Sequence, residues 1–176
     1  AFNSAREADA PLLSPQNFAN AEKYYARAED SFKRSSRIET ITEQLARANG
    51  YLKAAEESSR LASVTFSDAL QTRSAALAAQ SAQLAGEQWA KAEERFQQAA
   101  RALEDGNVKR AQSYSADAIA IYRDAELTAI QGAILNEART LIAQAKERRA
   151  ERYAPKTLGR AENLVAQATV DLQKDR

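Results

Sequence analysis

The sequence predicts an all-α protein: an elongated antiparallel helical array in which short and long helices alternate, with an internal repeat of about 70 residues. The first observation is a proline-led segment that occurs three times. The second is the spacing of the apolar residues between these segments, which alternates between three and four as on one face of a helix. The third is composition. Apolar residues make up 44% of the chain and aromatic residues only 7%, and the abundant alanine suits helices packed closely along a seam.

The repeated segment keeps one register at residues 15–28, 86–99 and 155–168. Proline or glycine stands in the first helical turn, followed by a bulky residue, an Ala-Glu pair, a second bulky residue and an alanine. The first bulky residues are Phe18, Trp89 and Leu158, the glutamates are Glu22, Glu93 and Glu162, and the second bulky residues are Tyr25, Phe96 and Val165. These spacings place the bulky and alanine positions on one helix face. We expect that face to contact a neighbouring helix and the glutamates to be solvated beside it.

The first repeat opens after a helical approach. Residues 1–11 have the pattern of the end of a long helix. A short helix then begins at Pro15, with Ser14 as its N-cap, and ends at the polar pair Ser35-Ser36.

The first long helix follows at once, and residues 36–39 fit a capping box at its start. Its seam, with residues alternately three and four apart, consists of Ile38, Ile41, Leu45, Ala48, Leu52, Ala55, Ser59, Ala62, Phe66 and Ala69. Because the seam crosses Asn49-Gly50 without a change of register, we expect one continuous helix there.

The second repeat follows the same plan. Its short helix begins at Gly86 and ends at Asp105-Gly106-Asn107, which combines a stop with a new N-cap. The seam of the second long helix consists of Ala111, Tyr114, Ala118, Ile121, Ala125, Ala138, Leu141 and Ala145, and a second stripe consists of Ile119, Ile130 and Ile134. The third short helix begins at Pro155. We therefore expect a single elongated helical domain over 1–176, with repeat units at approximately 15–85 and 86–154 and a partial unit at 155–176.

The residue inventory argues against an enzyme. The chain has no Cys and no His, which excludes thiolate and imidazole catalysis and the usual zinc sites. The acidic pairs Glu56-Glu57 and Glu93-Glu94 point about 100° apart along a helix and do not converge on one substrate atom. We expect no catalytic, cofactor-binding or metal-binding residues. A formal net charge of +1, without an aromatic platform, also excludes nucleic acid as a partner.

Four residues are candidates for a protein or lipid contact: Tyr24, Arg148, Arg149 and Arg152. Tyr24 lies beside the inward face of the first repeat and can stack at a surface. The arginines belong to "KERRAERY" at residues 146–153, where the simpler interpretation is favourable charge at the end of a long helix. Trp89 is either a binding hot spot or repeat core. We expect core, so that Trp89→Ala would cost about 3–5 kcal/mol if the ring is fully buried.

The segments "LLSPQNFANAEKYYARAE", "ALEDGNVKRAQSYSADAIAIYRDAEL" and "YAPKTLGRAENLVAQA" resemble a bacterial family. It is the alanine-rich helical domain of unknown function of envelope lipoproteins (the DUF4398 type), often found ahead of a C-terminal OmpA-like peptidoglycan-binding domain. The resemblance implies a periplasmic, outer-membrane-associated location in a Gram-negative bacterium. It supplies no catalytic residue, and peptidoglycan binding would belong to a domain that these residues do not include.

The expected function is therefore a non-enzymatic structural or protein-interaction module of the cell envelope, a spacer or scaffold associated with an OmpA-like protein. Its partners would be other envelope proteins, or further copies of itself, through helical surfaces. The alternative is a lipid- or membrane-surface-binding amphipathic helical protein, which the weak hydrophobicity of alanine faces disfavours. No apolar run approaches the roughly 18 residues that span a bilayer. Because the sequence starts at Ala1 rather than Met, we expect it to be a mature or excised fragment.

Overall fold

The computed structural model confirms the all-α class: residues 1–174, the part of the chain that the structure describes, form helices joined by short turns. Side chains are described as far as Asp171, so the end of the predicted partial unit at 155–176 lies outside the described residues. The helices are α1 (Phe2–Glu7), α2 (Ala10–Leu13), α3 (Pro15–Lys33), α4 (Ile38–Thr65), α5 (Ser67–Ala78), α6 (Ser81–Leu84), α7 (Gly86–Glu104), α8 (Val108–Glu147), α9 (Ala150–Tyr153) and α10 (Pro155–Lys174).

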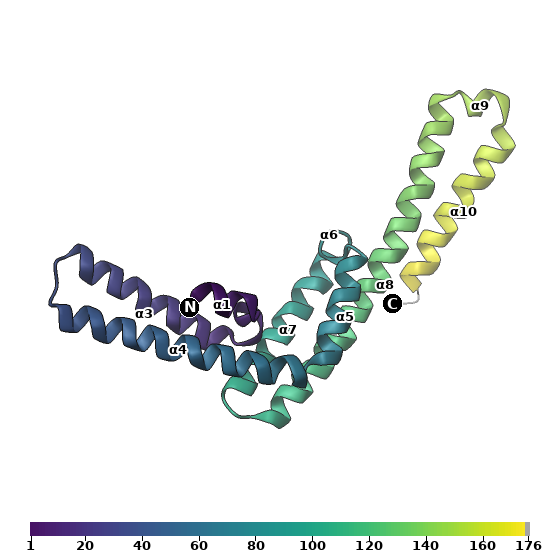
Figure 1. The fold of residues 1–176 in the computed structure, drawn as a ribbon. Helices are drawn as coiled ribbons and strands as arrows, with labels where there is room; N and C mark the ends of the chain where they lie inside the picture. The colour runs from purple at the N-terminus through teal and green to yellow at the C-terminus, as the bar shows by residue number, and fades with distance from the viewer. Residues whose placement is uncertain (175–176) are drawn as a thin grey trace.

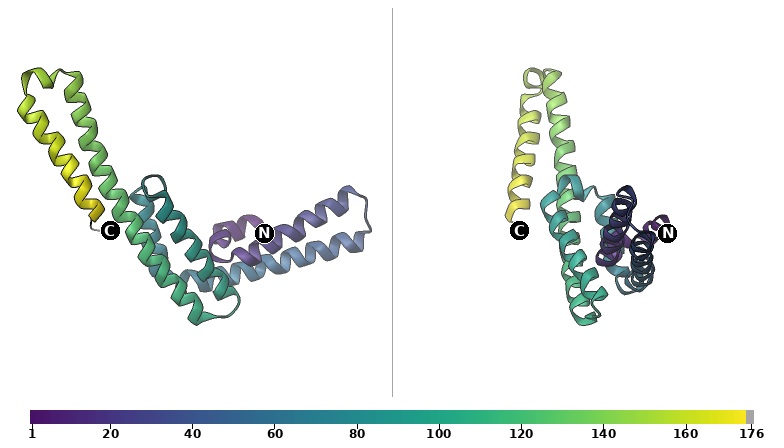
Figure 2. Two further views of the ribbon diagram at one scale, coloured as in Figure 1. Left: turned by 180° about the vertical axis from the view of Figure 1, so that it is seen from behind. Right: turned by 90° about the vertical axis from the view of Figure 1, so that its left-hand side faces the viewer.

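The helices form three parts that follow one another along an extended, bent outline (Figure 1). The N-terminal arm consists of α1 to α4, with α3 and α4 packed antiparallel. The central bundle consists of α5, α6, α7 and residues 108–129 of α8. The C-terminal hairpin consists of residues 130–147 of α8 with α9 and α10. Figure 2 shows from two further sides that the two outer parts diverge from the central bundle, and that α8 alone runs through two of the parts.

One turn geometry precedes all three proline-led segments. A residue with left-handed backbone starts each turn, and these residues are Asp9 (φ 52°), Gln80 (φ 60°) and Arg149 (φ 62°). Each is followed by a four-residue helix and then by a residue whose backbone is not helical: Ser14 (φ −141°), Ala85 (φ −136°) or Ala154 (φ −142°). The next residue begins α3, α7 or α10. The turns are thus alike, whereas the repeat of the whole unit of about 70 residues stays a prediction.

The first long helix is continuous across Asn49-Gly50, since α4 runs unbroken from Ile38 to Thr65. A break comes instead at Phe66, where the backbone leaves helical geometry at φ −110°. The side chain of Phe66 is 1% exposed, and its ring lies 5.6 Å from that of Phe96 in an edge-on contact. Burial of this ring fixes the point at which the chain leaves the N-terminal arm and enters the central bundle.

Most of the first predicted seam is buried, as expected, from Ile41 through Ala69. The prediction of burial is wrong for two members, since Ile38 is 67% exposed and Leu45 is 38% exposed. Both lie in the outer half of the N-terminal arm, where α3 and α4 form a two-helix hairpin beyond the reach of the short helix α1 (Figure 1). Two helices leave part of each apolar stripe open to solvent, whereas a third helix would close it.

The second seam is correct only for the alanines of its first half. Ala111, Ala118 and Ala125 are fully buried in the central bundle. The prediction is wrong for Tyr114 and Ile121, which are half-buried, because Ser115 and Tyr122 take the buried positions between these alanines. Beyond residue 129 the seam meets only the helices of the C-terminal hairpin, so Ala138 and Ala145 are half-buried. Exposed apolar side chains in this stretch of α8 are Ile130, Ile134 and Leu141. The second predicted stripe of Ile119, Ile130 and Ile134 is therefore partly covered only at Ile119, in the first half of α8.

The predicted caps have different outcomes. At the end of α7, Gly106 adopts φ +75° and Asn107 accepts a hydrogen bond from the Arg110 N–H at 3.1 Å, which confirms the stop and the N-cap. The capping box at 36–39 is wrong, because α4 starts one residue later, with Arg37 as its N-cap and no side-chain cap. The Ser36 N–H instead bonds the Ser31 carbonyl and closes the C-terminus of α3.

Candidate interaction site

The inward positions of the repeated segment are buried to different degrees. Phe18 and Leu158 are buried, as predicted. Trp89 is only half-buried, because its ring lies at the edge of the core, 5.4 Å from the ring of Tyr122 and 5.4 Å from the Arg73 guanidinium. Tyr25 is 42% exposed rather than inward, and its ring rests against Phe2 at 5.3 Å because no longer helix covers that side of the arm.

A polar network joins the three helices of the central bundle. The carboxylate of Glu93 on α7 accepts hydrogen bonds from Arg73 on α5 at 2.7 and 3.1 Å, and from the Tyr122 hydroxyl on α8 at 2.5 Å. Burial of Tyr122, together with the adjacent Glu93 carboxylate, raises the pKa of the phenol. The hydrogen bond to Glu93 raises the pKa of Arg73. Tyr122 and Arg73 therefore both stay protonated at neutral pH. The network holds the three helices together without a change of charge in this pH range.

This network corrects one expectation. Glu93 was expected to be solvated, but its side chain is only 23% exposed and its partner Tyr122 is fully buried. The matching glutamates of the first and third segments form ion pairs but remain open to solvent. Glu22 pairs with Arg6 at 3.6 Å, and Glu162 pairs with Lys146 at 2.5 Å. The same sequence position therefore has three environments, set by which helices surround it.

Glu104 connects the N-terminal arm to the central bundle. Its carboxylate, at the end of α7, accepts hydrogen bonds from the Ser14 hydroxyl at 2.6 Å and from the backbone N–H groups of Gln16 at 3.0 Å and Asn17 at 2.8 Å. An anion at a helix N-terminus satisfies free N–H groups and the helix dipole. Ser14 is therefore the N-cap residue of α3, but the capping side chain comes from Glu104. Sequence spacing gives no signal for a cap that comes from a distant helix.

Tyr24 belongs to an aromatic and cationic surface cluster on the N-terminal arm. Its ring stacks on Tyr51 of α4, with centroids 5.6 Å apart and planes 12° from parallel. The guanidinium groups of Arg27 and Arg47 lie over the Tyr24 ring at 5.3 and 5.6 Å. A hydrogen bond from Arg47 lowers the pKa of Tyr24. An open groove of about 380 Å³ lies beside the stack.

The three predicted arginines lie at the tip of the C-terminal hairpin. Arg148, Arg149 and Arg152 are all exposed, and Arg149 supplies the left-handed residue of the turn. The Arg152 guanidinium lies 5.9 Å from the ring of Tyr153, which is 75% exposed. This tip and Tyr24 lie in different outer parts of the molecule, so the structure does not bring the four predicted residues together (Figure 1).

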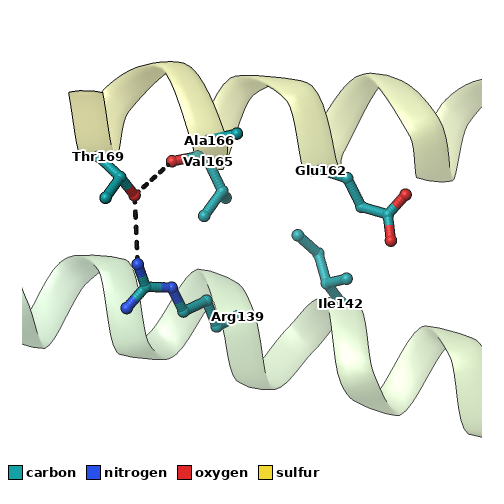
Figure 3. A pocket seen from close by; sticks show the side chains of 6 residues that line it. All are labelled: Arg139, Ile142, Glu162, Val165, Ala166 and Thr169. Atoms are coloured by element: carbon teal, nitrogen blue, oxygen red, sulfur yellow. Dashed lines mark hydrogen bonds between the residues drawn. The ribbon is translucent and has the colours of Figure 1, made fainter. Parts of the chain in front are cut away.

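An open surface lies between α8 and α10. Arg139 reaches across from α8 and donates a hydrogen bond to the Thr169 hydroxyl at 3.2 Å, and that hydroxyl donates to the Val165 carbonyl at 2.7 Å (Figure 3). With Ile142, Glu162 and Ala166 these residues line a shallow groove of about 460 Å³. Exposed aliphatic residues of the hairpin are Ile130, Ile134, Leu141, Leu164 and Val170. Sequence reasoning missed this surface because it assumed that the α8 seam is covered along its whole length.

Within residues 1–174, no group of three or more acidic side chains is placed to hold a metal ion. In the same range, no helix combines the length and apolarity that crossing a bilayer requires. Comparison with family models, with curated proteins and with solved structures returned no match for this chain.

Proposed function

We propose that this chain is a non-enzymatic spacer or scaffold of the bacterial cell envelope, which holds helical surfaces apart and presents them to partner proteins. The observation that carries the proposal is the extended arrangement of three helical parts (Figure 1). The last of these parts has several exposed apolar side chains. A contiguous exposed apolar surface is typical of an interaction site.

The junctions between the parts support a spacer that keeps its shape. Glu104 joins α7 to the N-terminus of α3, and Phe66 buries its ring where α4 passes into the central bundle. On the other side, α8 continues from the central bundle into the C-terminal hairpin without a break. A continuous helix transmits orientation better than a flexible linker does.

The envelope location rests on the resemblance of the sequence to the alanine-rich domain of envelope lipoproteins. On that basis we propose a periplasmic, outer-membrane-associated protein that acts beside an OmpA-like protein. Fractionation of a Gram-negative host that makes the full-length protein tests the location. Recovery with the cytosolic fraction would contradict it.

Small-angle scattering tests the spacer. A compact globule of this length has a radius of gyration of about 16 Å. We expect a clearly larger value and a distance distribution with a long tail. A value near that of the globule would refute an extended scaffold.

A membrane-surface function is the second candidate, and the exposed tip favours it. Tyr153 with Arg148, Arg149 and Arg152 combines an interfacial aromatic ring with cations. Co-sedimentation with vesicles of zwitterionic and anionic phospholipid tests it. Replacing the three arginines by glutamine would abolish sedimentation if the tip binds lipid. Glutamine at the exposed Lys33, Arg34 and Arg37 of the opposite tip removes equal charge and is the matched control. The scaffold proposal expects no sedimentation in either case.

A further inference from the structure

The C-terminal turn holds an apolar groove lined by alanines from three helices. The groove has a volume of about 220 Å³ and lies where α8, α9 and α10 meet. Its small residues are Ala145, Ala150, Ala154 and Ala161. Leu141, Ile142 and Leu158 add larger apolar side chains to its wall.

At the other two turns, the residues at the same positions are buried. When the turns are aligned on their left-handed residues, the matching residues in the central bundle are Ala76, Ser81, Ala85 and Ala92, with exposures of 0, 0, 4 and 0%. In the N-terminal arm they are Ala5, Ala10, Ser14 and Ala21, each at 0%. In the C-terminal hairpin Ala145, Ala150 and Ala161 are only half-buried and Ala154 is exposed. The same turn is therefore closed twice and open once.

A long antiparallel helix closes the first two turns. Leu52 and Ala55 of α4 pack in one cluster with Ala5, Ala10 and Ala21. At the second turn, Ala125 and Ala129 of α8 pack in one cluster with Ala85. The two covering helices share a pattern, because their buried stripes pair Ala48 with Ala118, Leu52 with Tyr122, and Ala55 with Ala125 at a constant separation of 70 residues. Alanines one heptad apart allow close approach, and a bulky residue between them fills the wider part of the seam.

We infer that the groove of the C-terminal turn is the docking site of a third such helix. The occupant is an alanine-rich amphipathic helix of a partner protein, antiparallel to α10, with small residues seven apart and a bulky residue four positions after the first. The packing of α4 and of α8 on the other two turns is the template for this interface. A second copy of the chain fits poorly as the donor, since its own α4 and α8 are already packed. The inference names the partner class of the scaffold proposed above, and it rests on that function for its biological meaning.

The exposed apolar side chains around the groove agree with this occupant. Leu141 and Leu164 project from the two helices that would flank the third one, and both are more than half exposed. In the central bundle the position that matches Leu141 is the polar Thr72. At this position the open turn therefore carries a large apolar side chain where the closed turn has a polar one, as expected of a surface that gains its cover from a partner.

The test uses the intact chain and a labelled peptide of residues 108–130, the segment of α8 that covers the second turn. We expect saturable binding by fluorescence anisotropy, with a gain of helical circular dichroism as the peptide folds on the groove. Ala118→Glu and Ala125→Glu in the peptide place charge on its buried stripe and should weaken binding at least about tenfold. These peptide variants leave the protein unaltered.

Substitutions in the protein locate the site. Ala145→Glu and Ala161→Glu should each weaken binding at least about tenfold, whereas Ala143→Glu should change it less than about twofold. Ala143 is exposed, and its counterpart in the central bundle, Ser74, stays exposed although α8 covers that turn. If Ala145→Glu leaves binding unchanged, the peptide has displaced α8 elsewhere and the inference is wrong.

Two other outcomes would also overturn it. One is an absence of peptide binding, and the other is concentration-dependent dimerisation in sedimentation velocity that Ala145→Glu abolishes, which would assign the groove to a second copy. Failure of the peptide test alongside an extended scattering profile would refute the docking site and leave the spacer proposal standing.

Discussion

Substitution of Glu93, the glutamate of the second repeated segment, is the sharpest test of how the environments of the three repeated segments differ. Glu93→Gln keeps the shape of the side chain and removes its charge. The Arg73 guanidinium, whose side chain is 24% exposed, then loses the carboxylate that it contacts through two nitrogens. A partly buried cation without its partner retains its desolvation cost and loses the compensating attraction.

The expected loss lies between two limits. Breaking a fully buried ion pair by removing one partner costs about 3–5 kcal/mol, and exposed pairs contribute about 0–1 kcal/mol. With Arg73 and Glu93 each about one quarter exposed, we expect a loss near 2 kcal/mol. In a domain of this size that corresponds to a fall in melting temperature of about 4–8 °C.

Urea unfolding followed by tryptophan fluorescence measures this loss where it occurs. Trp89 is the only tryptophan of the chain, and its ring lies 5.4 Å from that of Tyr122, so the signal reports on the central bundle. The matched control is Glu94→Gln, which removes the same charge from the next residue, on the exposed side of α7. The reasoning fails if both variants unfold at the same urea concentration. By circular dichroism, Glu22→Gln and Glu162→Gln should match the wild type, because both pairs are solvated.

Three further predictions use the same central bundle and its junction. Trp89→Ala should cost about 2–3 kcal/mol in thermal unfolding, less than a buried tryptophan, because the ring lies at the core edge; no change would place it outside the packing. Glu104→Gln should cost about 1–2 kcal/mol and speed amide hydrogen exchange at Gln16 and Asn17, and unchanged exchange would refute the cap. The raised pKa of Tyr122 keeps its phenol neutral in the fold, so the contribution of Tyr122 to stability should be constant below the ordinary tyrosine pKa of about 10 and fall as the pH rises above it. Tyr122→Phe should flatten that fall in urea titrations, and an equally steep fall would contradict the assignment.

The sequence was sufficient to predict the all-α class and the first residues of the three repeated helices, but it did not predict α1, α2, α5, α6 and α9 as separate helices. Apolar spacing predicted a continuous α4 through Asn49-Gly50, and Gly106 with Asn107 predicted the stop after α7. These features depend on local backbone preferences and on one helix face, both of which a single segment of sequence encodes. The inward positions of Phe18 and Leu158 follow from the same periodicity.

The polar contacts between distant helices could not be predicted in this way. Glu22, Glu93 and Glu162 occupy the same sequence position, yet only Glu93 lies among three helices with a tyrosine in reach. Glu104 caps a helix that begins about 90 residues earlier in the chain. Which helix lies beside a given face depends on where Phe66 breaks the long helix and on how many helices surround each turn. Amphipathic periodicity identifies a face to be covered but does not identify the helix that covers it.

The role of α8 follows from the change in burial along its length. In residues 108–129 its stripe is enclosed by α5 and α7, whereas in residues 130–147 it is supported by α10 and the short turn helix α9. One helix of 40 residues, about 60 Å long, thus belongs to two packing units of different strength. Local opening of a helix follows its local contacts, so the C-terminal hairpin is the part in which a partner helix would add most to stability. Because α8 is continuous, a helix docked at the open turn would also fix the direction in which the hairpin leaves the central bundle.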